Sequence, residues 1–211
     1  MNPKLITELT EQLKVKFRTE KPIIIIGGVA GSGKTTTGNM LLHEFELDHR
    51  IGTGWIREIV ASKTTQEQEP ALFVHSFRPL DAITPPFEHF TSASKAILPS
   101  VEACIRRARR EGQSLLIEGP MLIPGLLPED MYDIFVCLKK PEDQQEYFRI
   151  LTTGTHTKRK IYPADLPANV EIENNFLKIC QSKNIPVIPF VDKERRKAMI
   201  IKAIAHHFLG V

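Results

Sequence analysis

Cysteine is scarce in this sequence, and the few cysteines that occur form no pattern. The 211 residues contain three, at Cys104, Cys137 and Cys180, which lie far apart and include no C-x-x-C pair. An odd number at these spacings argues against a disulfide framework and against a cysteine-based zinc site. We therefore expect a protein of a reducing compartment, the cytoplasm.

Long hydrophobic runs are also missing. No stretch approaches the roughly 20 apolar residues of a membrane-spanning helix, and the segment Met1–Phe17 lacks the continuous apolar core of a signal peptide. In that segment Leu5, Leu9, Leu13 and Phe17 recur at helical spacing, which predicts an amphipathic helix packed on the domain. No membrane partner is expected.

An excess of charge of one sign is absent as well. The formal net charge is +3, and 25% of the residues are charged, the mixture of an ordinary globular protein. The densest basic cluster, Arg106–Arg110, has no interleaved aromatic residues for stacking on bases and is interpreted as a solvated helix face. Nucleic acid is therefore not expected as a partner, whereas a small anionic substrate fits the weak positive charge. No feature of the sequence predicts an oligomeric state.

Five short apolar runs bounded by polar or turn residues predict buried parallel strands. They are Ile23–Ile26, a weak run around Arg50–Ile51, Leu115–Ile117, Ile134–Leu138 and Pro186–Phe190. Helical patterns separate them, at Thr35–Phe45, Ser94–Arg110, Asp143–Leu151, Glu171–Lys183 and Glu194–Phe208. This alternation predicts an α/β doubly wound sheet, in which ligands bind at the carboxyl ends of the strands.

Two long connections interrupt the alternation. Residues 62–91 carry four prolines, and residues 149–167 are polar and basic. Connections of this length are usually functional loops or disordered segments. The chain shows no repeat, low-complexity tract or linker, and residues 1–211 are predicted to form a single domain.

The segment Gly28–Thr35 reads G-V-A-G-S-G-K-T and satisfies the phosphate-loop pattern G-x-x-x-x-G-K-[ST], between an isoleucine strand and a predicted helix. Its glycines let backbone N–H groups approach an anion, and the helix N-terminus adds positive potential. Lys34 is expected to reach the β- and γ-phosphates, and the Thr35 hydroxyl to ligate Mg²⁺. The predicted nucleotide-binding residues are Gly28, Ala30, Gly31, Ser32, Gly33, Lys34, Thr35 and Thr36.

The nucleotide is expected to be ATP, because the chain lacks the guanine-reading motif N/T-K-x-D. Glu118 ends the apolar run S-L-L-I-E, where P-loop proteins carry an acid that acts on Mg²⁺, on its water or on the acceptor. We therefore predict that Glu118 is catalytic. The alternative is a solvated glutamate that opens a turn.

These motifs and several longer stretches resemble the archaeal 2-phosphoglycerate kinases, a group of P-loop kinases. The matching text is IIIIGGVAGSGKTT, RIGTGWIREIV, HSF, IRRARREGQSLLIEGPMLIPGLLP and NNFLKICQSKNIPVIPF, in this order from Pro22 to Phe190. The resemblance implies a three-layer fold, with a parallel sheet of order 2-3-1-4-5 between helices. It also implies transfer of the γ-phosphoryl group of Mg-ATP to a small anionic acceptor, under a lid that carries cations.

The resemblance also assigns residues beyond the phosphate loop. Arg57 matches an arginine suited to gripping the acceptor, and we count it as catalytic beside the lysine of the loop and the acid of the third strand. His75 and Arg78, in the predicted acceptor-side insertion (residues 62–91), are candidates for acceptor contacts. Arg149 and Arg159, in the predicted lid (residues 149–167), are candidates for cations that stabilise the transferring group.

Two positions depart from the group's text. Gly54 stands where the group has an aspartate, and Met121 where it has a histidine. Both lie on the acceptor side, so we expect a changed acceptor. Two alternatives stay open: a nucleotide or polynucleotide kinase, and an ATP-binding module that has lost its acceptor chemistry. Trp55, beside Gly54, is expected to pack in the core.

Overall fold

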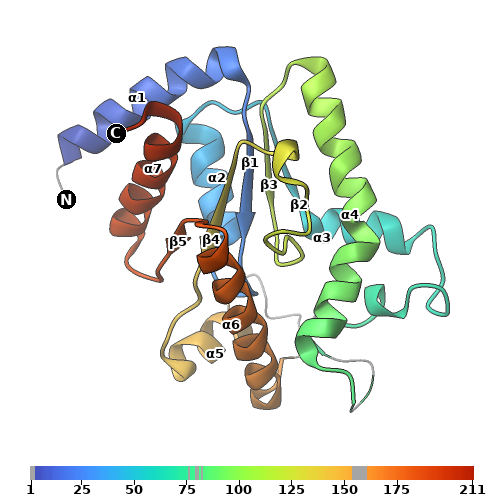
Figure 1. The fold of residues 1–211 in the computed structure, drawn as a ribbon. Coiled ribbons are helices and arrows are strands. Elements are labelled where there is room, and N and C mark those ends of the chain that lie inside the picture. The colour runs from blue at the N-terminus through green and yellow to red at the C-terminus, as the bar shows by residue number, and fades with distance from the viewer. Residues whose placement is uncertain (1–2, 76, 79–80, 82, 154–160) are drawn as a thin grey trace.

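A computed structural model describes residues 3–75, 77–78, 81, 83–153 and 161–211. Within them, five parallel strands form one sheet in the order β2-β3-β1-β4-β5 (Figure 1). The strands are β1 (Ile23–Gly27), β2 (His49–Gly52), β3 (Leu115–Glu118), β4 (Ile134–Leu138) and β5 (Val187–Ile188). The predicted fold class and strand order are therefore confirmed.

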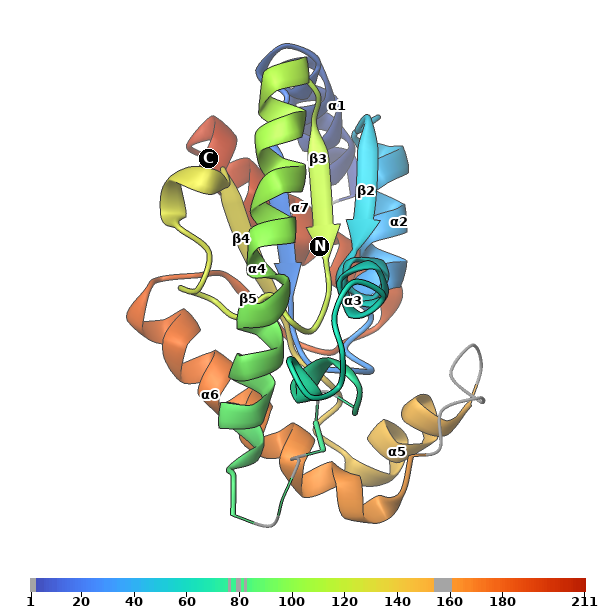
Figure 2. The ribbon, with the colours of Figure 1, turned by 90° about the vertical axis from the view of Figure 1, so that its right-hand side faces the viewer.

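Helices cover both faces of the sheet (Figure 2). The first face carries α1 (Pro3–Glu20), α2 (Lys34–Glu44) and α7 (Lys193–Leu209), and the second carries α4 (Pro86–Glu111) and α6 (Leu166–Ser182). In β1, Ile24 and Ile26 pack with the first set of helices, whereas Ile23 and Ile25 pack with the second. A central parallel strand is buried on both faces, which explains the uninterrupted isoleucine run.

The first helix is amphipathic, as its spacing predicts. Leu9, Leu13 and Phe17 are buried, and Leu5, one turn nearer the N-terminus, is 40% exposed. The buried face packs against α7, where the Phe17 ring meets Phe208 edge to face. Among the described residues, no helix is both long and apolar enough to cross a membrane.

Three helices differ from the sequence-based prediction, and two of them begin with a proline in the first turn. The helix predicted over Ser94–Arg110 begins at Pro86, so the connection before it ends at Pro85 rather than at residue 91. Likewise, α6 begins at Leu166, with a proline in its first turn, and not at Glu171. A proline in the first turn removes no helical hydrogen bond. A further helix, α3 (Thr53–Ala61), was not predicted at all.

The carboxyl ends of the strands meet the parts of the chain that the sequence marks as functional. There lie the phosphate loop, α3 and α5 (Gln144–Thr152), together with the first turns of α4 and α6 (Figure 2). The connection from Ser62 to Pro85 includes a 3₁₀ turn at Pro70–Leu72. In the predicted lid, Arg159 lies outside the described residues.

Candidate active site

The phosphate loop joins β1 to α2 with the backbone that its glycines predict. Gly28, Gly31 and Gly33 have positive φ angles of 135°, 74° and 83°, which residues with a side chain rarely adopt. At Gly28 a Cβ would also stand 2.4 Å from the carbonyl oxygen of Leu138. Gly33 caps α2 without a side-chain hydrogen bond, so no capping side chain competes with an anion for the first N–H groups of the helix.

Lys34 lies inside this loop. Its side chain is buried, and its ammonium donates hydrogen bonds to the Val29 carbonyl oxygen at 2.7 Å and to Ser32 Oγ at 3.3 Å. Both acceptors belong to the loop, so the positive charge is held where the phosphates of a nucleotide would enter. Thr36, also predicted to bind the nucleotide, is exposed in the first turn of α2.

Glu118 closes the site on the β3 side of the loop. It is 6% exposed, and its Oε1 accepts a hydrogen bond from Thr35 Oγ1 at 3.1 Å. The parallel register of β1 and β3 brings these residues together by placing Glu118 beside Ile26. Two residues 83 positions apart, both predicted for the metal and acceptor chemistry, are therefore in contact.

Arg50 is a site residue that the sequence reasoning missed. Its Nη1 donates to the same Glu118 oxygen at 2.8 Å, from the neighbouring strand β2. Gly38 of α2 leaves room for the arginine, because a Cβ there would be 3.1 Å from Arg50 Cδ. One signal in the sequence could have identified Arg50. It is a cation in the weak apolar run predicted as a strand, and this strand pairs with the one that ends at Glu118.

The donor set at Thr35 and Glu118 fits a magnesium ion. A hydroxyl and a carboxylate oxygen lie 3.1 Å apart beside the phosphate loop, and Mg²⁺ prefers oxygen ligands. Among the described residues, no group of three or more His, Cys, Asp or Glu side chains could hold a metal by itself. Such a site suits an ion that takes its other ligands from phosphates and water.

Helix α5 packs directly on the phosphate loop. The Tyr147 hydroxyl donates to the Ala30 carbonyl oxygen at 2.9 Å, and a Cβ at Gly31 would be 3.0 Å from both Tyr147 and Leu151. Arg149 lies on the same helix, and its side chain is exposed. The lid candidate Arg149 is thus attached to the loop through its helix.

Arg57, predicted to grip the acceptor, binds backbone oxygens in the acceptor-side connection. Its Nε donates to the Leu72 carbonyl oxygen at 2.9 Å, and its Nη2 donates to those of Leu72 and Val74 at 2.6 and 2.5 Å. These bonds hold the Ser62–Pro85 connection against α3. An acceptor contact for Arg57 stays a prediction.

The two other acceptor candidates lie in the same connection. The His75 ring stacks on Phe77, with centroids 5.3 Å apart. Arg78 forms a bidentate pair with Asp165, at 2.7 Å from Nε and 2.6 Å from Nη2, and this guanidinium lowers the pKa of the Asp165 carboxyl. Arg78 therefore ties the connection to the turn before α6, and acceptor contacts for both residues stay predictions.

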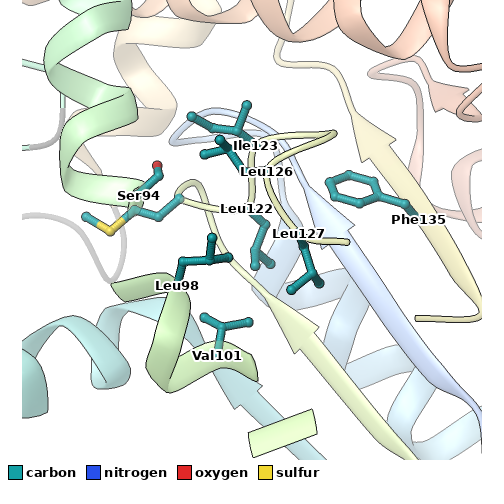
Figure 3. A pocket seen from close by; sticks show the side chains of 9 residues that line it. Ser94, Leu98, Val101, Leu122, Ile123, Leu126, Leu127 and Phe135 are labelled. Carbon is teal, nitrogen blue, oxygen red and sulfur yellow. The ribbon is translucent and has the colours of Figure 1, made fainter. Parts of the chain in front are cut away.

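The two positions that depart from the sequence pattern of the archaeal group, Gly54 and Met121, have different surroundings. Gly54 is the second residue of α3 and is exposed, and nothing lies within 4 Å of the position of a Cβ there. Met121 is 5% exposed and lines an apolar cavity of about 10 Å³, together with Leu98, Val101 and Phe135 (Figure 3). The structure therefore has room for a polar side chain at position 54, whereas position 121 belongs to the core.

The prediction that Trp55 packs in the core is wrong. Trp55 is 75% exposed and Ile59, one turn later, is 65% exposed. The inward face of α3 instead carries Thr53 and Ile56, which are 1% and 5% exposed. Thr53 Oγ1 is buried with no hydrogen-bond partner among the described residues, and it lies directly over Gly119.

No family model matches the chain, but comparison with curated proteins finds similar sequences. The chain is 27% identical over 191 residues to a 2-phosphoglycerate kinase of Pyrococcus furiosus, covering 86% of this chain and 63% of that protein. It is 28% identical over 200 residues to a 2-phosphoglycerate kinase of Pyrococcus horikoshii, covering 90% and 66%. The chain thus spans about two thirds of these relatives. The predicted resemblance to archaeal 2-phosphoglycerate kinases is confirmed.

A solved structure supports the fold. The shikimate kinase from Acinetobacter baumannii, in complex with shikimate, superimposes with a TM-score of 0.50, over 93% of this chain and 97% of that chain. The sequence identity is 14%, so the likeness concerns the fold alone. It agrees with a P-loop kinase fold.

Proposed function

We propose that this chain is a P-loop kinase that transfers the γ-phosphoryl group of ATP to a small anionic acceptor of the 2-phosphoglycerate type. The observation that carries the proposal is the contact between Thr35, next to the lysine of the phosphate loop, and the buried carboxylate of Glu118. A carboxylate at this place can act on Mg²⁺, on its water or on the acceptor hydroxyl, which are the roles that phosphoryl transfer gives to an acid. The similarity to enzymes named 2-phosphoglycerate kinase supports the acceptor class.

Catalysis in this site rests on positioning and on neutralising charge. The loop amides and Lys34 bind the β- and γ-phosphates and stabilise the charge that develops on the transferring group. Thr35 and Glu118 would hold Mg²⁺, which supplies further charge neutralisation when bound. Glu118, fixed by Arg50, orients either the water on the metal or the hydroxyl of the acceptor.

The acceptor enters from the side of β2 and β3, where α3 and the Ser62–Pro85 connection lie. Arg57, His75 and Arg78 lie there, and such side chains suit a carboxylate or phosphate. In the structure Arg57 binds backbone oxygens and Arg78 pairs with Asp165, so their acceptor contacts stay predictions. Because Met121 is a core residue, binding of the acceptor does not use a side chain at position 121. The departure at position 121 therefore gives no support to a changed acceptor, which stays a prediction from Gly54.

The test is a turnover assay that measures ADP formed from Mg-ATP in the presence of a panel of acceptors. The panel contains 2-phosphoglycerate, other small phosphorylated or carboxylated hydroxy acids, nucleoside monophosphates and a 5′-hydroxyl oligonucleotide. Lys34→Ala is the blank, and Lys202→Ala, at an exposed lysine of α7, is the matched control. We expect acceptor-dependent turnover that Lys34→Ala abolishes and Lys202→Ala retains.

Each of the other outcomes would replace the proposed function by a different one or reject the proposed site. Turnover with nucleoside monophosphates or the oligonucleotide alone would replace the small acid by a nucleotide acceptor. ATP binding without turnover on any acceptor would identify an ATP-binding module. Undiminished turnover in Lys34→Ala would reject the site itself.

A further inference from the structure

A buried arginine outside the predicted site touches the phosphate loop. Arg196, in the first turns of α7, is 8% exposed. Its Nη2 donates to the Lys139 carbonyl oxygen at 3.2 Å, and its guanidinium lies 5.3 Å from the centre of the Phe190 ring. A Cβ at Gly33 would be 2.8 Å from its Nη1. The glycine before Lys34 thus lets the guanidinium lie against the backbone of the loop.

The positive charge of the Arg196 guanidinium has no acidic partner in the described part of the chain, and one of its donors is unused. Its Nε is buried without a hydrogen-bond partner, and no acid in the described part of the chain forms an ion pair with it. Burial lowers the pKa of Arg196 to about 10, so the group is still charged at neutral pH. An unpaired charge in the interior opposes folding. A protein keeps such a charge where a ligand compensates it, as at an anion site.

The strand order places Arg196 on one particular side of the loop. β1 lies between β3 and β4. Glu118 and the acceptor-side elements follow β2 and β3, whereas Lys139 follows β4 and Phe190 follows β5. The γ-phosphate must point toward the acceptor for transfer, so the rest of the nucleotide extends toward β4 and β5. Arg196 stands at that end.

We propose that Arg196 binds the nucleotide. Its guanidinium would pair with the α- and β-phosphates, on the side of the phosphate loop away from the acceptor. The inference rests on the proposed nucleotide binding and adds a residue that no sequence motif contains. It assigns to Arg196 a role in nucleotide affinity and none in the transfer of the γ-phosphoryl group. ATP and ADP share the α- and β-phosphates, so both depend on this residue.

The test compares Arg196→Met with Arg195→Met in the full chain. Arg195 is exposed on the same helix, so the two variants lose the same charge from the same element. Titration calorimetry with ATP and with ADP measures affinity, and urea unfolding measures stability. A charged hydrogen bond of this kind corresponds to roughly 10- to 100-fold in affinity.

We expect Arg196→Met to lower the affinity for ATP and for ADP by this same factor. The KM for ATP should rise, and kcat should change less than about threefold. Its resistance to urea should not fall, because an uncompensated buried charge is replaced by an apolar side chain of similar length. Arg195→Met should match the unchanged protein in both measurements. Nucleotide affinity then falls while stability does not, which a purely structural arginine cannot produce.

Unchanged nucleotide affinity in Arg196→Met, with lower resistance to urea, would overturn the inference and leave the proposed function standing. If the unchanged protein binds neither ATP nor ADP, both fail together. Should Arg196→Met not fold, Arg196→Gln takes its place, since glutamine keeps a donor for the Lys139 oxygen. The same loss of affinity is expected there, and affinity equal to that of the unchanged protein would overturn the inference.

Discussion

The pair formed by Arg50 and Glu118 joins the sheet to the candidate site, and its removal has a measurable effect on stability. In Arg50→Met, the Glu118 carboxylate loses a hydrogen bond of 2.8 Å, and from the described residues it keeps the bond of 3.1 Å from Thr35. The Glu118 side chain is 8% exposed and that of Arg50 is 23% exposed. Water therefore reaches the arginine but hardly reaches the carboxylate.

The size of the effect follows from this asymmetry. Removing one partner of a fully buried ion pair costs about 3–5 kcal/mol, and a charged hydrogen bond contributes about 1.5–3 kcal/mol. Because Arg50 is partly exposed, we expect Arg50→Met to lower the free energy of unfolding by about 2 kcal/mol. Glu118→Gln leaves a partly exposed arginine without its acid and should cost about 1 kcal/mol.

The assay is a double-mutant cycle by urea unfolding at neutral pH. The two single variants and the double variant give a coupling energy, expected at about 1–2 kcal/mol for contacting charges. Arg106→Met is the matched control, because its pair with Glu102 lies on the surface of α4 with the arginine 54% exposed, and it should cost less than about 0.5 kcal/mol. Additivity of the Arg50 and Glu118 variants within about 0.5 kcal/mol would refute the reasoning.

Three further predictions concern packing and pH. Gly119→Ala should lower the free energy of unfolding by about 2 kcal/mol or more, because its Cβ would stand 1.7 Å from Thr53 Oγ1; a urea midpoint equal to that of the unchanged protein would contradict the packing. Burial opposes ionisation of Asp48, but hydrogen bonds led by the Ser114 backbone N–H outweigh it and lower the pKa of Asp48 from 3.8 to about 2. The stability from Asp48 is therefore present above about pH 4 and lost as the pH falls toward about 2. Asp48→Asn should cost about 1 kcal/mol at neutral pH after screening and nothing below that window, as measured by urea midpoints across pH. Met121→His should restore the residue of the related text yet cost about 1–3 kcal/mol without raising turnover, since position 121 lines an apolar cavity; a gain in kcat would show that this side chain reaches the acceptor.

The phosphate loop could be predicted from residues that are neighbours in the sequence. Its function depends on consecutive amides, on glycines with positive φ and on a helix that begins at the next residue. All of these are properties of neighbouring residues, and the motif contains them. The isoleucine run of β1 is similar, because a strand buried on both faces needs apolar residues at every position.

The positions of the side chains around the loop depend on tertiary contacts, which the spacing of residues in the sequence does not reveal. Arg50 meets Glu118 across 68 positions, and the bonds from Arg57 reach Leu72 and Val74 over 15 and 17. Trp55 was expected inside and lies outside, because the direction of each side chain follows from how α3 sits on its neighbours. The lid residue Arg159 and the acceptor contacts of Arg57, His75 and Arg78 stay predictions.

By itself, the sequence determined the phosphate loop, the alternation of strands and helices, and the acid at the end of β3, since each is encoded in residues close together along the chain. Only the tertiary structure decided which side chains share the site. The parallel register of β2, β3 and β1 brings Arg50 and Glu118 to Thr35, and the packing of α7 brings Arg196 to Gly33. A hydrogen bond or an ion pair acts over a few ångströms in space, and separation along the chain does not measure that distance.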